Sequence, residues 1–128
     1  MTMAELPTKW HAFDVFWSSF GWNAYDENTV PDNAGNKYIT YEAATGSLDD
    51  VLYLSASLWH INATAWDVLD KKQAEIENAI GYSHYDLPVQ GGQMVIRRGS
   101  PFAQRMQDAT DKRTRRVLLN IAVEFITA

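Results

Sequence analysis

The chain has 128 residues, of which 46% are hydrophobic and 21% charged, as is typical of one globular domain with its own core. It has no cysteine, which excludes disulfides, thiolate catalysis and cysteine-ligated zinc. A formal net charge of −5 argues against general nucleic-acid binding. The first residues lack a secretory signal pattern and no apolar run reaches bilayer-spanning length, so we expect one cytosolic domain over residues 1–128 with no membrane partner.

The first predicted element is a helix with an unusually aromatic face. Thr8 is a candidate N-cap, and Gly21 stands where a left-handed residue can end the helix. Between them, large apolar side chains recur at the spacing of one helical face, at Trp10, Phe13, Phe16, Trp17 and Phe20. We expect this face to pack into the core, with a contact to another subunit as the alternative.

A pair of strands follows a loop over residues 26–37. A short strand is possible at 22–25, and β-branched and aromatic residues predict longer strands over 37–45 and 51–61. The short break between the two longer strands favours an antiparallel hairpin. Alternation within 51–61 puts Leu52, Leu54, Ala56 and Leu58 on one face, and Tyr53, Ser55, Ser57 and Trp59 on the other.

The second helix is predicted over residues 64–81. Thr64 begins it in a Ser/Thr-x-x-acid pattern, and Gly81 ends it. Its apolar face is formed by Trp66, Leu69, Ile76 and Ile80, with Gln73 as a polar interruption.

The C-terminal part predicts a long hairpin. After a polar and aromatic connection over 82–90, strands are expected over 91–98 and 115–127, the second with strict alternation. The connection 99–113 is longer than a usual hairpin loop, which suggests a functional segment. We therefore predict an α+β domain with an antiparallel or mixed four-stranded sheet, two helices and a hairpin arm at 97–116.

The histidines give no pattern for metal binding or catalysis. His11, His60 and His84 fall in different elements and lack the spacing of a metal motif. Ser83, His84 and Asp86 are the residue types of a hydrolytic triad, but triads are assembled in space, so their adjacency in sequence is no evidence for one.

Acidic residues near the predicted hairpin give no clear metal site either. Glu42, Asp49 and Asp50 could form a carboxylate cluster for a divalent cation, although a solvated turn explains them better. We expect no catalytic residues, no bound metal and no cofactor.

Positive charge is concentrated near the C-terminus. Residues 97–128 hold 7 basic and 3 acidic residues, whereas residues 1–96 hold 4 and 13. We predict that the arm of one copy docks against an acidic face of the next, a head-to-tail contact of the kind that can close into a ring. Surface ion pairs contribute little energy, so apolar residues must supply affinity. The predicted contact residues are Arg97, Arg98, Phe102, Arg105, Met106, Lys112, Arg113, Arg115 and Arg116.

Three stretches in succession carry a family resemblance: "VPDNAGNKYITYEA", "VLYLSASLWHINATAWDVLDKKQAEIENAI" and "GGQMVIRRGSPFAQRMQDATDKRTRRVLLNIAVEF". In pattern and order they resemble the tail terminator (tail completion) proteins of long-tailed bacteriophages and related prophages. That family also has a first helix, a Val-Pro segment entering a Tyr-containing strand, a strand ending in a Leu-Trp element and a helix rich in Ala, Ile and Glu. The likeness covers nearly the whole chain.

The resemblance implies a structural virion protein without enzymatic activity. Family members form hexameric rings on the head-proximal end of the tail tube, stop tube growth and present a surface to the head connector. The implied partners are other copies of the chain, the major tail tube protein and the head connector or stopper. The implied location is the head–tail junction of the virion, after assembly in the host cytoplasm. The chain could alternatively be another neck or head–tail joining component, a tail tube subunit, or a small α+β ligand-binding domain or enzyme, which would need a pocket with converging polar groups.

Overall fold

The computed structural model describes residues 6–43, 51–107 and 113–127. Within these ranges the chain forms two helices and six strands. They are α1 (Lys9–Ser18), β1 (Ala24–Asp26), β2 (Lys37–Tyr41), β3 (Leu52–His60), α2 (Asp67–Ile80), β4 (Tyr85–Val89), β5 (Gly92–Gln107) and β6 (Arg115–Thr127). Neither described helix has the length and apolar character needed to cross a membrane.

The six strands form one mixed sheet in the order β1-β2-β3-β6-β5-β4. β1 and β2 are parallel, and the other four neighbouring pairs are antiparallel, including the two predicted hairpins β2–β3 and β5–β6. The predicted α+β class is therefore confirmed. The predicted count of four strands is wrong, because β1 and β4 also join the sheet, one at each end.

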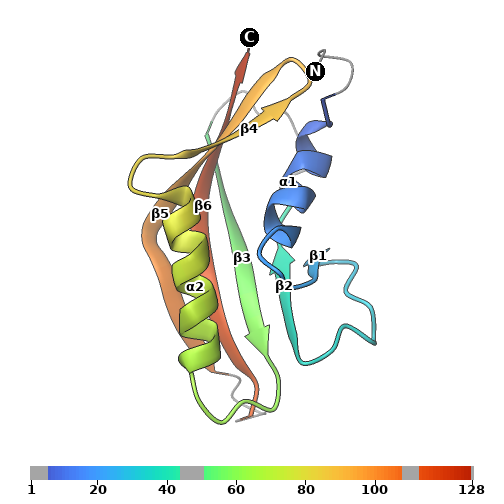
Figure 1. The fold of residues 1–128 in the computed structure, drawn as a ribbon, viewed down its shortest axis with the longest axis vertical. Helices are drawn as coiled ribbons and strands as arrows, with labels where there is room; N and C mark the ends of the chain where they lie inside the picture. Colours follow the sequence, from blue (N-terminus) through green and yellow to red (C-terminus); the bar gives the residue numbers. More distant parts are fainter. Residues whose placement is uncertain (1–5, 44–50, 108–112, 128) are drawn as a thin grey trace.

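Both helices lie on the same face of the sheet (Figure 1), α1 against β1, β2 and β4, and α2 against β3, β5 and β6. α1 contacts strands near both ends of the strand order. Between ring centroids, Phe13 lies 5.7 Å from Tyr41 of β2, and Phe16 lies 5.0 Å from Tyr85 of β4. The sheet therefore curls around α1. The opposite face, called the open face below, carries no helix within the described residues.

The aromatic face of α1 forms the centre of the core, as predicted. Phe13, Phe16 and Trp17 are at most 2% exposed, and Phe13 meets Trp17 edge to face with centroids 6.0 Å apart. Thr8 occupies the N-cap position, but its side chain makes no capping hydrogen bond. Gly21, with φ of 83°, turns the chain toward β1 after α1 ends.

α2 begins later than predicted and buries a lysine. Its N-cap is Trp66 and its first residue is Asp67, so the predicted start at Thr64 is wrong. Leu69, Ile76 and Ile80 are buried as predicted. Lys72, one turn after Leu69, is also buried. Its Nζ donates to the carbonyl of Phe20 at 2.5 Å and to Glu75 Oε2 at 2.8 Å. Lys72 thus holds the segment after α1 against α2 while its aliphatic stem is buried.

The predicted connection 82–90 contains β4, which the sequence analysis missed. β4 pairs with the start of β5 from Tyr85–Ile96 to Val89–Gly92 and places Leu87 against the core. Pro88 lacks a backbone N–H, which an edge strand tolerates because one side of the strand has no partner. Pro88 is thus compatible with a strand at the edge of a sheet.

β5 extends well beyond the predicted strand. It continues to Gln107, so the prediction of an irregular connection over 99–113 is wrong for residues 99–107, and residues 108–112 lie outside the described ranges. Pairing with β6 shifts between Arg98–Ile121 and Ala103–Leu119, so four residues of β5 stand opposite the single residue Asn120. This bulge lets a segment containing Gly, Ser and Pro remain in the sheet.

Candidate subunit interface

The predicted contact residues lie on both faces of the β5–β6 arm. Arg98, Phe102, Arg105 and Arg115 contact α2, its N-cap or the core on the helix side. Arg97, Met106 and Arg116 alternate onto the open face. Arg113 is exposed just before β6, and its carbonyl accepts the N–H of Ala63 at 2.8 Å. Lys112 lies outside the described residues.

Two of the helix-side arginines bind opposite ends of α2. Arg105 Nη2 donates to Asp70 Oδ2 at 2.6 Å, in the first turn of the helix. Arg98 Nη2 donates to the carbonyl of Glu77 at 2.9 Å, and its Nη1 lies 3.3 Å from Glu77 Oε1. A guanidinium at the C-terminal end of a helix also meets the negative end of its dipole. The arm is therefore attached to α2 of its own chain.

Trp66 completes this attachment. The guanidinium carbons of Arg105 and Arg115 lie 4.9 and 5.3 Å from the centre of its ring, within the range of cation–π attraction. The arginines were predicted from the sequence, but their partners Trp66, Asp70 and Glu77 were not. Part of the charge separation along the sequence is thus neutralised inside one copy.

On the open face, a row of two aromatic rings and one guanidinium crosses three strands. Tyr38 of β2 stacks beside Trp59 of β3 with centroids 6.1 Å apart, and Arg116 of β6 lies 5.0 Å over the Trp59 ring. Trp59 Nε1 donates to Thr40 Oγ1 at 2.9 Å, and Arg116 Nε donates to Ser57 Oγ at 3.0 Å. These hydrogen bonds fix the row in place.

Large apolar side chains are also exposed to solvent at separate places on the same face, with Met106 opposite Arg116 and with Tyr53 opposite Ala122. Tyr53 of β3 is 80% exposed, and Ile126 and Met106 are 46% and 41% exposed. Leu118 and Ala122 on the intervening strand β6 are half-buried. The alternation noted within 51–61 is the sequence signal for this surface, since it puts Tyr53 and Trp59 opposite the core.

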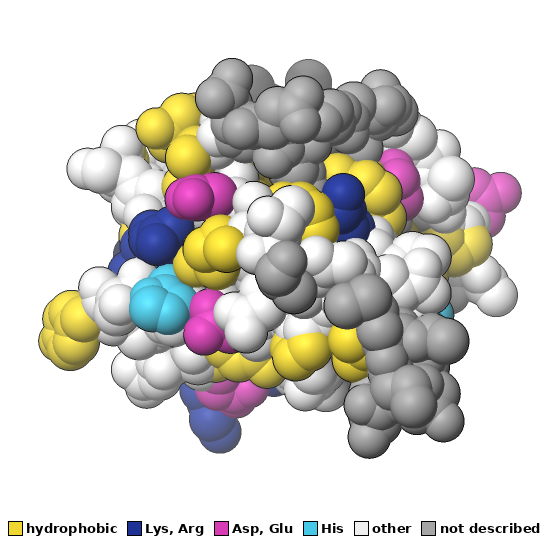
Figure 2. All heavy atoms as spheres, turned by 90° about the horizontal axis from the view of Figure 1, so that it is seen from above, with side chains coloured by type: hydrophobic (Ala, Val, Ile, Leu, Met, Phe, Trp, Pro, Cys, Tyr) yellow, Lys and Arg dark blue, Asp and Glu magenta, His cyan; other side chains and the backbone are white. Residues whose placement is uncertain are grey.

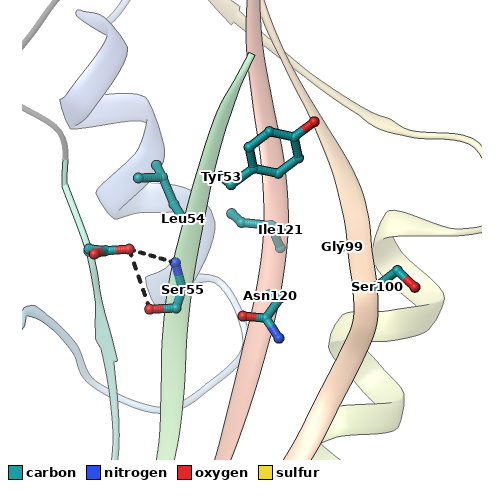
Figure 3. A pocket seen from close by; sticks show the side chains of 8 residues that line it. Tyr53, Leu54, Ser55, Gly99, Ser100, Asn120 and Ile121 are labelled. Carbon is teal, nitrogen blue, oxygen red and sulfur yellow. Dashed lines mark hydrogen bonds between the residues drawn. The ribbon is translucent and has the colours of Figure 1, made fainter.

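A groove of about 500 Å³ lies on the sheet where β5 bulges (Figure 3). Its lining includes Tyr53 and Ser55 of β3, Asn120 of β6 and the bulge residues Gly99 and Ser100. A Cβ atom at Gly99 would lie 2.8 Å from the carbonyl oxygen of Asn120, so the bulge backbone passes β6 more closely than a side chain allows. Asn120 Nδ2 donates to the carbonyl of Pro101 at 2.9 Å and holds the bulge.

Glu42, the one acidic candidate among the described residues, has a structural partner in the fold. Glu42 Oε1 accepts hydrogen bonds from the N–H and Oγ of Ser55, at 2.9 and 3.3 Å (Figure 3). Asp49 and Asp50 lie outside the described residues, within which no group of three or more His, Asp or Glu side chains could hold a metal ion.

The Ser83, His84 and Asp86 side chains do come together in space. Ser83 Oγ lies 2.7 Å from His84 Nδ1, and His84 Nε2 lies 3.3 Å from Asp86 Oδ1. All three residues are exposed, so water competes for each of these contacts. This proximity gives no particular reason to assign the serine a nucleophilic role.

His60, at the end of β3, pairs with Lys37 of β2 and Arg115 of β6. Desolvation, followed by repulsion from Lys37 and then Arg115, lowers the pKa of His60 from its usual 6.5, against the partial opposition of Asp67. A histidine whose pKa is lowered on folding stabilises the fold fully above its unfolded pKa. That stability is lost as the pH falls from about 6.5 through the folded value.

We therefore expect the stability of His60→Gln to depend less on pH than that of the wild type between pH 7 and pH 5. Lys37→Gln should weaken the dependence in the same direction but by less, because it removes only one of the causes. Urea midpoints measured at both pH values test this. An unchanged pH dependence in His60→Gln would show that other groups control stability in this range.

Comparisons with known proteins do not add an independent assignment. No protein-family model, curated protein or solved structure matches this chain. The functional proposal therefore depends on the chain's own residues and on the resemblance in element order noted in its sequence.

Proposed function

We propose that this protein is a self-associating structural subunit that forms a ring and acts as a tail terminator of a long-tailed phage. In that role the ring would cap the head-proximal end of the tail tube, stop its polymerisation and offer a surface to the head connector or stopper. The observation that carries the proposal is the open face of the sheet. The resemblance in sequence supplies the biological setting.

The open face has the properties of a protein-binding surface. An antiparallel sheet can face water on one side, but the exposed side is then normally polar. Here Tyr53, Met106 and Ile126 are exposed, and Trp59 and Arg116 lie on the same face. Large apolar side chains on an open sheet face become buried when a partner packs on it, and Trp, Tyr and Arg are the residue types that most often dominate binding energy.

Self-association can be measured directly by native mass spectrometry or light scattering at moderate salt. We expect oligomers of the purified protein, or oligomers that appear when the tail tube protein is added. A protein that stays monomeric at micromolar concentrations under both conditions would rule out the proposal.

A matched pair of substitutions tests whether the open face is the surface used. Tyr53→Asp should weaken assembly, of the protein alone or with the tail tube protein, at least tenfold, since it places a carboxylate where an aromatic side chain would be buried by the partner. Tyr82→Asp is the control, because Tyr82 is 100% exposed and lies on the connection between α2 and β4. Both changes should leave the thermal stability of the monomer nearly unchanged.

The two variants must differ in assembly, alone or with the tail tube protein, for the open face to be a binding surface. Equal loss in both would point to a general effect of added negative charge. Wild-type assembly by Tyr53→Asp would move the interface away from this part of the sheet.

A further inference from the structure

At each end of the sheet, part of a strand has no partner strand on its outer side within the described residues. β1 is the last strand at one end of the sheet. At the other end, β4 covers β5 only from Gly92 to Ile96. On that side, the described residues provide no strand partner for Arg97–Gln107. Figure 1 shows β1 and the loop after it on one side of the molecule, and β5 with α2 on the other.

The register of the sheet puts these two edges at the same level. Two rows of paired residues cross five strands, from Ala24 to Arg105 through Ile39, Leu58 and Val117, and from Asp26 to Ala103 through Tyr41, Ala56 and Leu119. A second copy continued along these rows would therefore bring its β1 beside the second half of β5.

The outer side of β1 has backbone groups available for such a contact. The carbonyl of Asn23 accepts from Ile39 at 2.9 Å, and the N–H of Glu27 donates to Tyr41 at 3.0 Å, both toward β2. Because successive residues of a strand direct their backbone groups to opposite sides, the N–H and carbonyl of Ala24 and the N–H of Asp26 point outward. The carbonyl of Asp26 already accepts the N–H of Thr29 at 2.9 Å. A strand of three residues offers few hydrogen bonds, so side chains must define the pairing.

The side chains at the two edges have opposite charge. Asp26 ends β1, and Glu27 and Asp32 follow it. Within the described residues none of these three forms an ion pair with a base. On β5, the side chain of Arg105 remains 55% exposed despite its contact with Asp70. By contrast, acidic, basic and hydrophobic side chains are interspersed over the described part of the end seen in Figure 2.

We infer that neighbouring copies join head to tail, with the β1 edge of one copy beside Ala103–Gln107 of β5 in the next, and Asp26 facing Arg105. This inference rests on the self-association proposed above. The two edges are different surfaces, so every copy keeps one edge free for another neighbour. Such heterologous contacts continue until rotation between copies closes a ring. A two-fold dimer of β1 edges would instead place like charges together.

The absence of native cysteine permits a direct test by site-specific cross-linking. The positions are Glu27, just after β1, and Gln104, in the second half of β5, both exposed. With a short thiol-specific cross-linker, we expect the double variant Glu27→Cys with Gln104→Cys to give a ladder of trimers and larger products. A mixture of the two single variants should give dimers only, and each single variant alone should stay uncross-linked.

A matched control pairs Glu27→Cys with Tyr82→Cys, which is equally accessible but lies outside the proposed contact. It should cross-link at less than a tenth of the rate of the first pair. Dimers from Glu27→Cys alone would overturn the head-to-tail geometry in favour of a two-fold contact.

Native mass spectrometry of the same wild-type samples separates this inference from the proposed function. Wild-type oligomers together with an unlinked double variant would overturn the edge-to-edge contact alone. A strictly monomeric wild type, with or without tube protein, would overturn both.

Discussion

Replacing Phe13 with alanine is expected to lower the free energy of unfolding by about 3–5 kcal/mol, as for other fully buried aromatic residues. Phe13 is 0% exposed and meets the rings of Trp10, Trp17 and Tyr41 edge to face, at centroid distances of 5.5, 6.0 and 5.7 Å. The cavity would thus lie between α1 and β2, and α1 would lose the contact between Phe13 and Tyr41 of β2. Urea unfolding followed by tryptophan fluorescence measures the loss.

Val15→Ala is the matched control, because it truncates an apolar side chain on the same helix that is 51% exposed. Its effect should stay within about 0.5 kcal/mol of the wild type, as is usual for surface substitutions. If Phe13→Ala were as mild as Val15→Ala, the aromatic face of α1 would not form the core described above. The alternative that this face contacts another subunit would then have to be reconsidered.

The elements with strong periodicity were predictable from sequence. The spacing of Phe13, Phe16 and Trp17 predicted α1, and strict alternation after Arg115 predicted β6, with Val117 and its alternate neighbours inward. In both cases one buried face is repeated over enough residues to outweigh local exceptions.

The missed strand segments contain residues that normally indicate turns. β4 was not predicted because it contains Pro88, and the second half of β5 was not predicted because it contains Gly99, Ser100 and Pro101. Both are tolerated for reasons that require the sheet order: Pro88 lies on an edge strand, and the bulge opposite Asn120 absorbs the extra residues. The order of the strands in the sheet could not be predicted from local patterns in the sequence.

The candidate site was predictable only as a set of basic residues. Arg98 and Glu77 are separated by 21 residues, and Arg105 and Asp70 by 35, so no local pattern pairs them. Only the placement of α2 over β5 and β6 brings the acids of the helix to the arm. The free edges of β1 and β5 likewise follow from pairing across five strands.

The arginines of the arm should therefore differ in how much they contribute to the stability of the fold and to contacts between copies. We expect Arg98→Met to lower the free energy of unfolding by about 1.5–3 kcal/mol, the range for hydrogen bonds that involve a charged group. The change keeps an apolar stem beside Phe102 but leaves the carbonyl and carboxylate of Glu77 without the guanidinium. Arg98→Lys should not restore the full stability, since one ammonium cannot reproduce the planar two-nitrogen contact.

Glu77→Gln is the control that separates the two contacts of Arg98, because it retains the backbone carbonyl and removes only the carboxylate charge. It should cost less than about 1 kcal/mol, as expected for a partly exposed ion pair. Both variants should still oligomerise when assayed well below their unfolding midpoints, since Arg98 binds α2 of its own chain and lies outside the segment Ala103–Gln107 proposed to contact the next copy. Loss of assembly by Arg98→Met with wild-type stability would instead place Arg98 in the contact between copies.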